Sequence, residues 1–136
     1  MPVQLNHTIV WCTDKKRSAE FLAEMLGRPA PRAFVHFLIV DLDNGVSLDF
    51  YQQDEKPALQ HYAFLTSEPE FNQVLSRIKQ QGLDHWADPA RSQRGQINHH
   101  WGGRGVYFED PDGHLLEVVT KSYGDPSGIL SKTTHT

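Results

Sequence analysis

The sequence predicts an α+β fold built from two copies of a strand–helix–three-strand module, and two kinds of internal match predict it. Two segments open alike with Leu-x-His, at Leu5 and at Leu59, and each passes through an apolar run into an amphipathic stretch closed by a glycine. The ends of the two halves also match, because Asn44–Gly45 and Asp112–Gly113 each precede a leucine and a carboxylate at equal spacing. Self-similarity at a fixed period indicates a duplicated structural unit.

One helix is expected in each module. Apolar residues recur at helical spacing in both amphipathic stretches, namely Phe21, Leu22, Met25 and Leu26 in the first and Phe71, Val74, Leu75 and Ile78 in the second. Ser67 and Glu70 have the spacing of a capping box, which predicts that the second helix begins there. Gly27 and Gly82 follow the two stretches, where a left-handed helix cap is expected.

The remaining segments predict strands and the limits of the modules. Asn44–Gly45 is a strong hairpin signal, and the apolar run 37–40 supplies the strand before it. We expect a single domain over residues 1–136, with a first βαβββ module over 1–52 and a second over 59–122. Residues 123–136 are expected to form a C-terminal tail.

Composition narrows the range of partners. The chain has 136 residues, a formal charge of −4 and scattered basic residues, which argues against nucleic acid as a partner. No apolar run approaches the roughly 20 residues of a membrane-spanning helix. The start of the sequence lacks the pattern of a secretory signal, and Cys12 is the single cysteine, so a cytoplasmic location is expected. Cys12 itself is expected to be a small core residue rather than a nucleophile.

Strand parity predicts which polar side chains share a face. Side chains alternate along a strand, so His7 and His61 point away from the face that the helices cover. Glu117 lies in the middle of an apolar strand, and a buried carboxylate is costly unless it is paired or binds a metal. Where the sheets curve around a common concavity, these three side chains are expected to converge as a facial triad for a divalent metal. The alternative is that each histidine is a hydrogen-bonded structural residue.

Together with the closing sequence FEDPDGHLLEVVT, these residues resemble the vicinal oxygen chelate superfamily. That superfamily contains glyoxalase I, type I extradiol dioxygenases, fosfomycin-resistance thiol transferases and bleomycin-binding proteins. The resemblance covers roughly residues 5–120. It implies the glyoxalase/bleomycin-resistance/dioxygenase fold, in which paired βαβββ modules form a cupped mixed sheet. It also implies metal ligation by His7, His61 and Glu117, and a homodimer whose sites are often built from both subunits. The ligand set accepts Fe, Mn, Ni, Co or Zn.

The resemblance leaves the reaction type open. Glyoxalase I takes a fourth ligand, usually glutamate, from the position that Asp49 occupies here. Ile9 stands where the fosfomycin-resistance enzymes have their catalytic threonine. Tyr107 matches a tyrosine that faces the substrate in both the dioxygenases and the fosfomycin-resistance enzymes, so it favours neither.

Several further residues are candidates for the site, each with a structural alternative. Asp49 is a metal ligand, an acceptor beside the metal, or a carboxylate that reaches solvent. Asp49 and His100 are the candidate bases, although His100 also fits a solvated loop. Arg104 either faces an anionic substrate or lies on the surface. Trp101 and Tyr51 are candidate substrate-binding residues, with core packing as the default for aromatic side chains.

Two functions follow from these patterns. The first is a metal-dependent enzyme that chelates vicinal oxygens of a small-molecule substrate, as a dioxygenase, an isomerase or lyase, or a thiol transferase. The alternative is a metal-independent binding protein of the bleomycin-resistance type, which sequesters its ligand in an aromatic groove. The presence of all three ligand types favours the enzyme.

Overall fold

A computed structural model describes residues 2–122, which divide into two compact units. Of the described residues, the first unit comprises 2–59 together with Asp110–Gly113, and the second comprises Gln60–Glu109 and 114–122. The tail expected over residues 123–136 lies outside the described residues.

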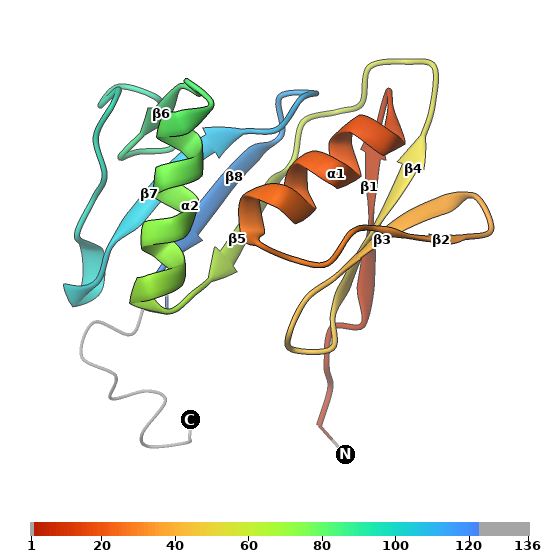
Figure 1. Ribbon diagram of the computed structural model, residues 1–136, viewed down its shortest axis with the longest axis horizontal. Helices are drawn as coiled ribbons and strands as arrows, with labels where there is room; N and C mark the ends of the chain where they lie inside the picture. Colours follow the sequence, from red (N-terminus) through yellow and green to blue (C-terminus); the bar gives the residue numbers. More distant parts are fainter. Residues whose placement is uncertain (1, 123–136) are drawn as a thin grey trace. The chain divides into compact units, whose positions relative to one another are not determined.

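The first unit is a four-stranded mixed sheet with one helix (Figure 1). Its strands follow the order β1-β4-β3-β2, in which β1 and β4 are parallel and the other pairs antiparallel. The helix α1 contacts β3 and β4. The elements in chain order are β1 (His7–Cys12), α1 (Lys15–Leu26), β2 (Arg32–Phe34), β3 (Phe37–Asp41) and β4 (Ser47–Gln52).

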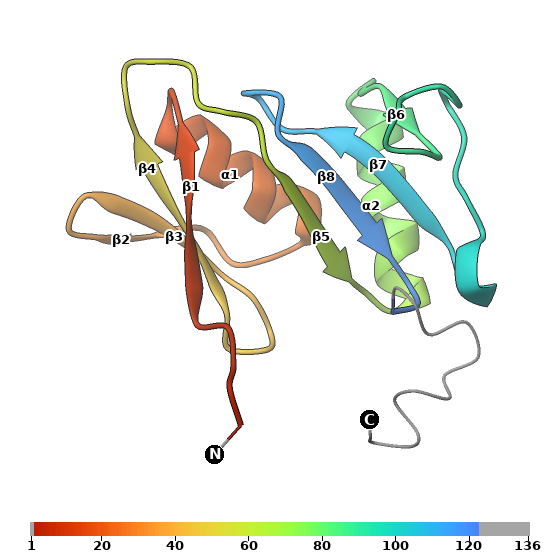
Figure 2. The ribbon, with the colours of Figure 1, turned by 180° about the vertical axis from the view of Figure 1, so that it is seen from behind.

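The second unit repeats this topology, with strand order β5-β8-β7-β6 and a parallel β5–β8 pair. Its elements are β5 (His61–Leu65), α2 (Glu68–Gln80), β6 (His85–Trp86), the 3₁₀ turn η1 (His100–Gly102), β7 (Gly105–Glu109) and β8 (Leu115–Val119). Figure 2 shows β5, β8 and β7 side by side, with α2 behind β7 in this view. The expected βαβββ duplication and the α+β fold class are therefore confirmed.

Each sheet buries one face and leaves the other more open. Buried apolar side chains come from alternate positions of β1, β4, β5 and β8 and from most of the apolar positions of the helices. They include Val10, Cys12, Leu48 and Phe50 with Leu22 and Met25 of α1, and Phe64, Leu116 and Val118 with Phe71, Val74 and Ile78 of α2. Full burial of such a side chain contributes about 1.5–3 kcal/mol. The predicted strand parity is thus confirmed, and the histidines of β1 and β5 lie on the open faces.

The helix ends match the signals in the sequence. Ser67 and Glu70 form the expected reciprocal capping box at the start of α2. Gly27 ends α1 with φ of 67°, a left-handed conformation that glycine adopts without steric penalty. Within residues 2–122, neither helix is long and apolar enough to cross a bilayer.

Cys12 is fully buried in the first unit, and its Sγ donates to the carbonyl oxygen of Tyr51 at 3.5 Å. Burial raises the pKa of this thiol to about 11, with further contributions from Asp112, Asp110 and Asp14. A thiol that stays protonated near neutral pH is a poor nucleophile. Cys12 is therefore a core residue.

The turn Asp110–Gly113 connects β7 to β8 yet belongs to the first unit. Asp112 Oδ1 accepts a hydrogen bond from Thr13 Oγ1 at 2.7 Å. Its Oδ2 accepts from the Thr13 backbone N–H at 3.1 Å and from Ser18 Oγ at 3.4 Å. The second aspartate of the Asp-Pro-Asp-Gly motif thus fixes the segment that leads into α1.

We expect Asp112→Ala to lower the free energy of unfolding by about 1–3 kcal/mol, because Thr13 and Ser18 lose their acceptor. Urea denaturation monitored by circular dichroism measures the change. Asp54→Ala is the matched control, since Asp54 is exposed and its replacement should shift stability by no more than about 0.5 kcal/mol. Equal effects of the two substitutions would contradict this role of Asp112.

Candidate functional site

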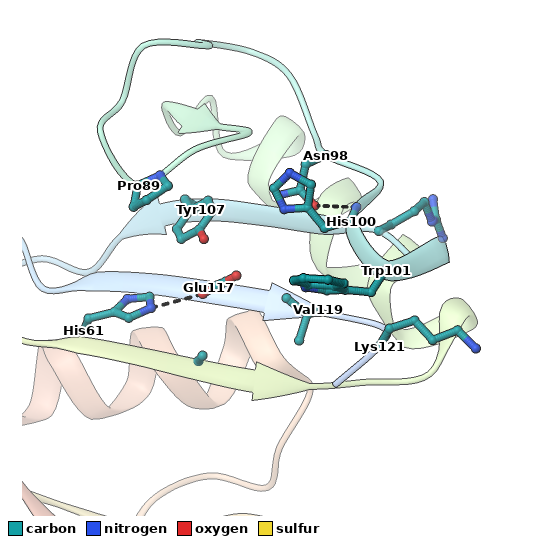
Figure 3. A pocket seen from close by; sticks show the side chains of 11 residues that line it. His61, Pro89, Asn98, His100, Trp101, Tyr107, Glu117, Val119 and Lys121 are labelled. Atoms are coloured by element: carbon teal, nitrogen blue, oxygen red, sulfur yellow. Dashed lines mark hydrogen bonds and ion pairs between the residues drawn. The ribbon is translucent and has the colours of Figure 1, made fainter. Parts of the chain in front are cut away.

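His61 and Glu117 meet on the open face of the second sheet (Figure 3). The parallel register of β5 and β8 pairs His61 with Leu115 and Ala63 with Glu117, so both polar side chains lie on one face. His61 Nε2 lies 3.0 Å from Glu117 Oε1. The imidazole is half exposed, whereas the Glu117 side chain is only 17% exposed. The carboxylate in the middle of the last strand therefore has a specific partner.

The hydrogen bond made by the other ring nitrogen of His61 decides whether Nε2 faces Glu117 with a proton or with a lone pair. His61 Nδ1 lies 3.0 Å from the Leu115 carbonyl oxygen, which can only accept, so Nδ1 carries a proton. In a neutral ring Nε2 then presents a lone pair to Glu117, which is also an acceptor. The two atoms need a cation between them, either a proton on the ring or a metal. A histidine that donates its second N–H to a backbone carbonyl is typical of metal sites, so the pair fits a divalent ion.

A cavity of about 630 Å³ opens beside this pair within the second unit. Its apolar lining comes from Ala63, Pro89, Trp101, Tyr107 and Val119. Pockets for small molecules fall in the range of about 300–1,000 Å³ and combine an apolar lining with a few convergent polar groups. The second unit therefore has a site of suitable size and chemistry for a small ligand.

Tyr107 lies in the floor of the cavity, directly across from Glu117 in the β7–β8 register. Its side chain is 8% exposed, and its ring stacks on the His61 imidazole at a centroid distance of 6.0 Å. The stacking restricts the rotation of the imidazole. Tyr107 thus supports the pair, and its ring faces the cavity together with Glu117 (Figure 3).

His100 and Trp101 reach the cavity from the η1 turn. The buried Asn98 organises this turn, because its Nδ2 donates to the Ala87 carbonyl at 2.8 Å and its Oδ1 accepts from the His100 N–H at 3.3 Å. The sequence predicts His100 and Trp101 as candidates but not Asn98. A single asparagine in a loop carries no periodic signal that distinguishes it.

Arg104 lines the cavity, but its charge is engaged by α2. Its Nε donates to Glu68 Oε1 at 2.8 Å and one terminal nitrogen donates to Asn72 Oδ1 at 2.7 Å. The guanidinium carbon also lies 4.4 Å from the centre of the Phe71 ring. Hydrogen bonds from Thr120 and then Arg104 hold the pKa of Glu68 below its usual value. In this arrangement the guanidinium fixes the η1 turn to α2 and does not supply a free positive charge to the cavity.

The other sequence candidates lie in the first unit. His7 Nδ1 lies 2.6 Å from Asn6 Oδ1 on the open face of β1. Asp49 is 9% exposed, and its Oδ1 accepts from Ser47 Oγ at 2.8 Å. Tyr51 packs edge-on against Trp11. No cluster of three His, Cys, Asp or Glu side chains that could hold a metal occurs within residues 2–122. The roles expected for His7, Asp49 and Tyr51 therefore stay predictions.

Asp49 and Glu117 occupy equivalent positions in the two sheets. In the first sheet Asp49 of β4 pairs in register with Ile9, two residues after His7. In the second sheet Glu117 of β8 pairs with Ala63, two residues after His61. The two modules share this geometry, yet the shorter carboxylate is held by serine and the longer one by histidine.

Comparisons with known proteins agree with this architecture. A family model described as "Glyoxalase/Bleomycin resistance protein/Dioxygenase superfamily" matches residues 4–118. The solved structure of "Oxidase ChaP-H1" is 53% identical, with a TM-score of 0.89 over 90% of this chain and 99% of the other. "Oxidase ChaP-H2" is 52% identical, with a TM-score of 0.89 over 91% and 98%. "Glutathione transferase FosA" of Serratia marcescens is 29% identical over 84% of this chain and 78% of its own length.

We expect Glu117→Gln to weaken binding of a divalent metal by about tenfold or more, because the amide removes the negative charge beside His61. Dialysis against Fe(II), Mn(II) or Zn(II), followed by elemental analysis, measures the metal retained. Glu109→Gln is the matched control, since Glu109 lies on the same sheet and pairs with Arg91 outside the cavity. Equal metal retention by the two variants would exclude Glu117 as a ligand.

Proposed function

The chain belongs to the Glyoxalase/Bleomycin resistance protein/Dioxygenase superfamily, and we propose that it is a metal-dependent oxidase or dioxygenase. Its substrate is a small molecule that presents two vicinal oxygens. The observation that carries this proposal is the His61–Glu117 pair, oriented by the Leu115 carbonyl at the wall of an apolar cavity.

The residues that hold the metal in this proposal are His61, Glu117 and, as the third ligand, His7. His61 offers its Nε2 lone pair, and the mostly buried Glu117 supplies the negative charge that offsets desolvation of a cation. When bound, a divalent ion supplies Lewis-acid polarisation and orients the substrate oxygens.

The remaining residues of the cavity position the substrate and handle protons. The apolar walls, including Val119 and Pro89, would exclude water once a substrate fills the cavity, and so would strengthen electrostatic interactions there. Tyr107 restrains the His61 ring and presents its phenol at the floor. His100 is the candidate for proton transfer, since imidazole is suited to that role near neutral pH and this one lines the cavity.

The pattern of sequence identity supports oxidation over thiol transfer. Identity to the oxidases is much higher and extends over nearly the whole of each chain, whereas identity to the glutathione transferase is lower.

We propose that the enzyme acts as a homodimer, because the open face of the first sheet carries an aromatic cluster. Tyr51 contacts Trp11 at a ring-centroid distance of 5.3 Å and Phe37 at 5.5 Å, and Trp11 remains 40% exposed. Exposed aromatic patches mark interaction surfaces. In the proposed dimer, His7 of one subunit completes the metal site formed by His61 and Glu117 of the other.

Oxygen uptake tests the proposed chemistry. Protein loaded with Fe(II) or Mn(II) should consume oxygen in the presence of a vicinal diol such as 2,3-dihydroxynaphthalene. His61→Ala should lower the rate by about 100-fold or more, because it removes a ligand. Consumption of glutathione with fosfomycin, without oxygen uptake, would instead identify a thiol transferase.

Mixing of two inactive variants tests the shared site. We expect His7→Ala and Glu117→Gln proteins each to bind little metal. Co-refolded as mixed dimers, they should regain roughly a quarter of the wild-type sites per chain, because one site of each heterodimer then has all its ligands. If His7 serves its own chain, every site lacks a ligand and the mixture should gain no metal.

A further inference from the structure

Trp101 has a backbone conformation that is unusual for a bulky residue. Its φ of 60° and ψ of 23° place it in the left-handed region inside the η1 turn. Among residues 2–122, only Val35 and Arg91 share a positive φ without being glycine. This region is strained for large side chains and persists only where the surrounding structure imposes it.

The loop around Trp101 is closely packed. The Gly103 N–H donates to the His100 carbonyl at 3.0 Å, which closes the turn around Trp101. A Cβ on Gly103 would lie 2.6 Å from Thr120 Oγ1, and one on Gly105 would lie 2.8 Å from Asn98 Oδ1. The strand β7 and the residues after β8 thus leave no room for a side chain at Gly103 or Gly105.

Core packing does not explain the strain at Trp101. The indole is 38% exposed, whereas Trp86 of the same unit is 9% exposed. The indole lies beside Val119 and extends into the cavity that Glu117 and Tyr107 also face (Figure 3). The strained backbone therefore places a large flat side chain in the binding site.

We propose that Trp101 determines specificity by stacking on a planar, conjugated substrate that carries the two vicinal oxygens. This inference rests on the proposed function and narrows its substrate class. Four flat rings line the cavity with Val119, namely those of His61, His100, Trp101 and Tyr107. Flat apolar walls favour a flat apolar ligand, because aromatic faces stack with offset contact over a large area.

Ligand binding by matched variants tests this role. Trp101→Asn removes the ring but tolerates a left-handed backbone, whereas Trp101→Phe keeps a flat ring. The probes are 2,3-dihydroxynaphthalene, which is planar, and acetohydroxamate, an aliphatic chelator with two adjacent oxygens. We expect Trp101→Asn to weaken binding of the diol by about tenfold and binding of acetohydroxamate by less than about twofold. Trp101→Phe should bind the diol with an affinity within about threefold of wild type.

Val35→Gly provides the control for relief of strain alone. Val35 has φ of 54°, is 73% exposed and lies in the first unit, outside the cavity, so this variant should leave both affinities unchanged. Equal loss of both probes in Trp101→Asn would show that the residue only shapes the loop. That result, or an unchanged affinity for the diol, overturns the proposal.

Metal content separates this inference from the proposed function. Trp101→Asn should retain wild-type metal, because the indole is not a ligand. If the wild-type protein binds no metal, the proposed function fails, while the Trp101-dependent binding of the diol is still measured on chelator-treated protein. Failure of the wild-type protein to bind the diol in either form overturns the inference.

Discussion

The hydrogen bond between His61 and the Leu115 carbonyl is the constraint on which the candidate site depends. It fixes the proton on Nδ1 and turns Nε2 toward Glu117, so a cation is required between them. The bond exists because β5 and β8 are parallel neighbours in one register. A slip by one residue would move Glu117 to the face that α2 covers and would leave His61 without its partner.

The same alternation that forms the core also separates it from the site. Phe64, Leu116 and Val118 pack on the helix side, while the residues between them supply polar groups to the open side. The strands therefore hold His61, Tyr107 and Glu117, and the η1 turn adds His100 and Trp101 to the wall of the cavity. Sites on strands keep their geometry because both neighbouring strands restrain the backbone.

Local patterns in the sequence predict the modules, the caps and the faces of the strands. They also predict that His61 and Glu117 face the same side, because parity and the repeat register need only sequence spacing. Two features are not predictable in this way. One is the ion pair of the Arg104 guanidinium with Glu68, and the other is the left-handed backbone conformation of Trp101. Both arise from contacts between a loop and distant elements, for which the sequence has no periodic signal. Parity likewise assigns His7 to a face without specifying which groups that face meets.

The turn at Asp110–Gly113 links the stability of the first unit to the end of the second repeat. Residues encoded late in the second repeat complete the first unit, where Asp112 accepts from Thr13 and Ser18. A fragment that ends before the second repeat would lack this acceptor, so the first repeat on its own would be less stable than the same segment within the full chain. The later copy thus supplies a contact to the earlier one, and the two halves are not independent of each other.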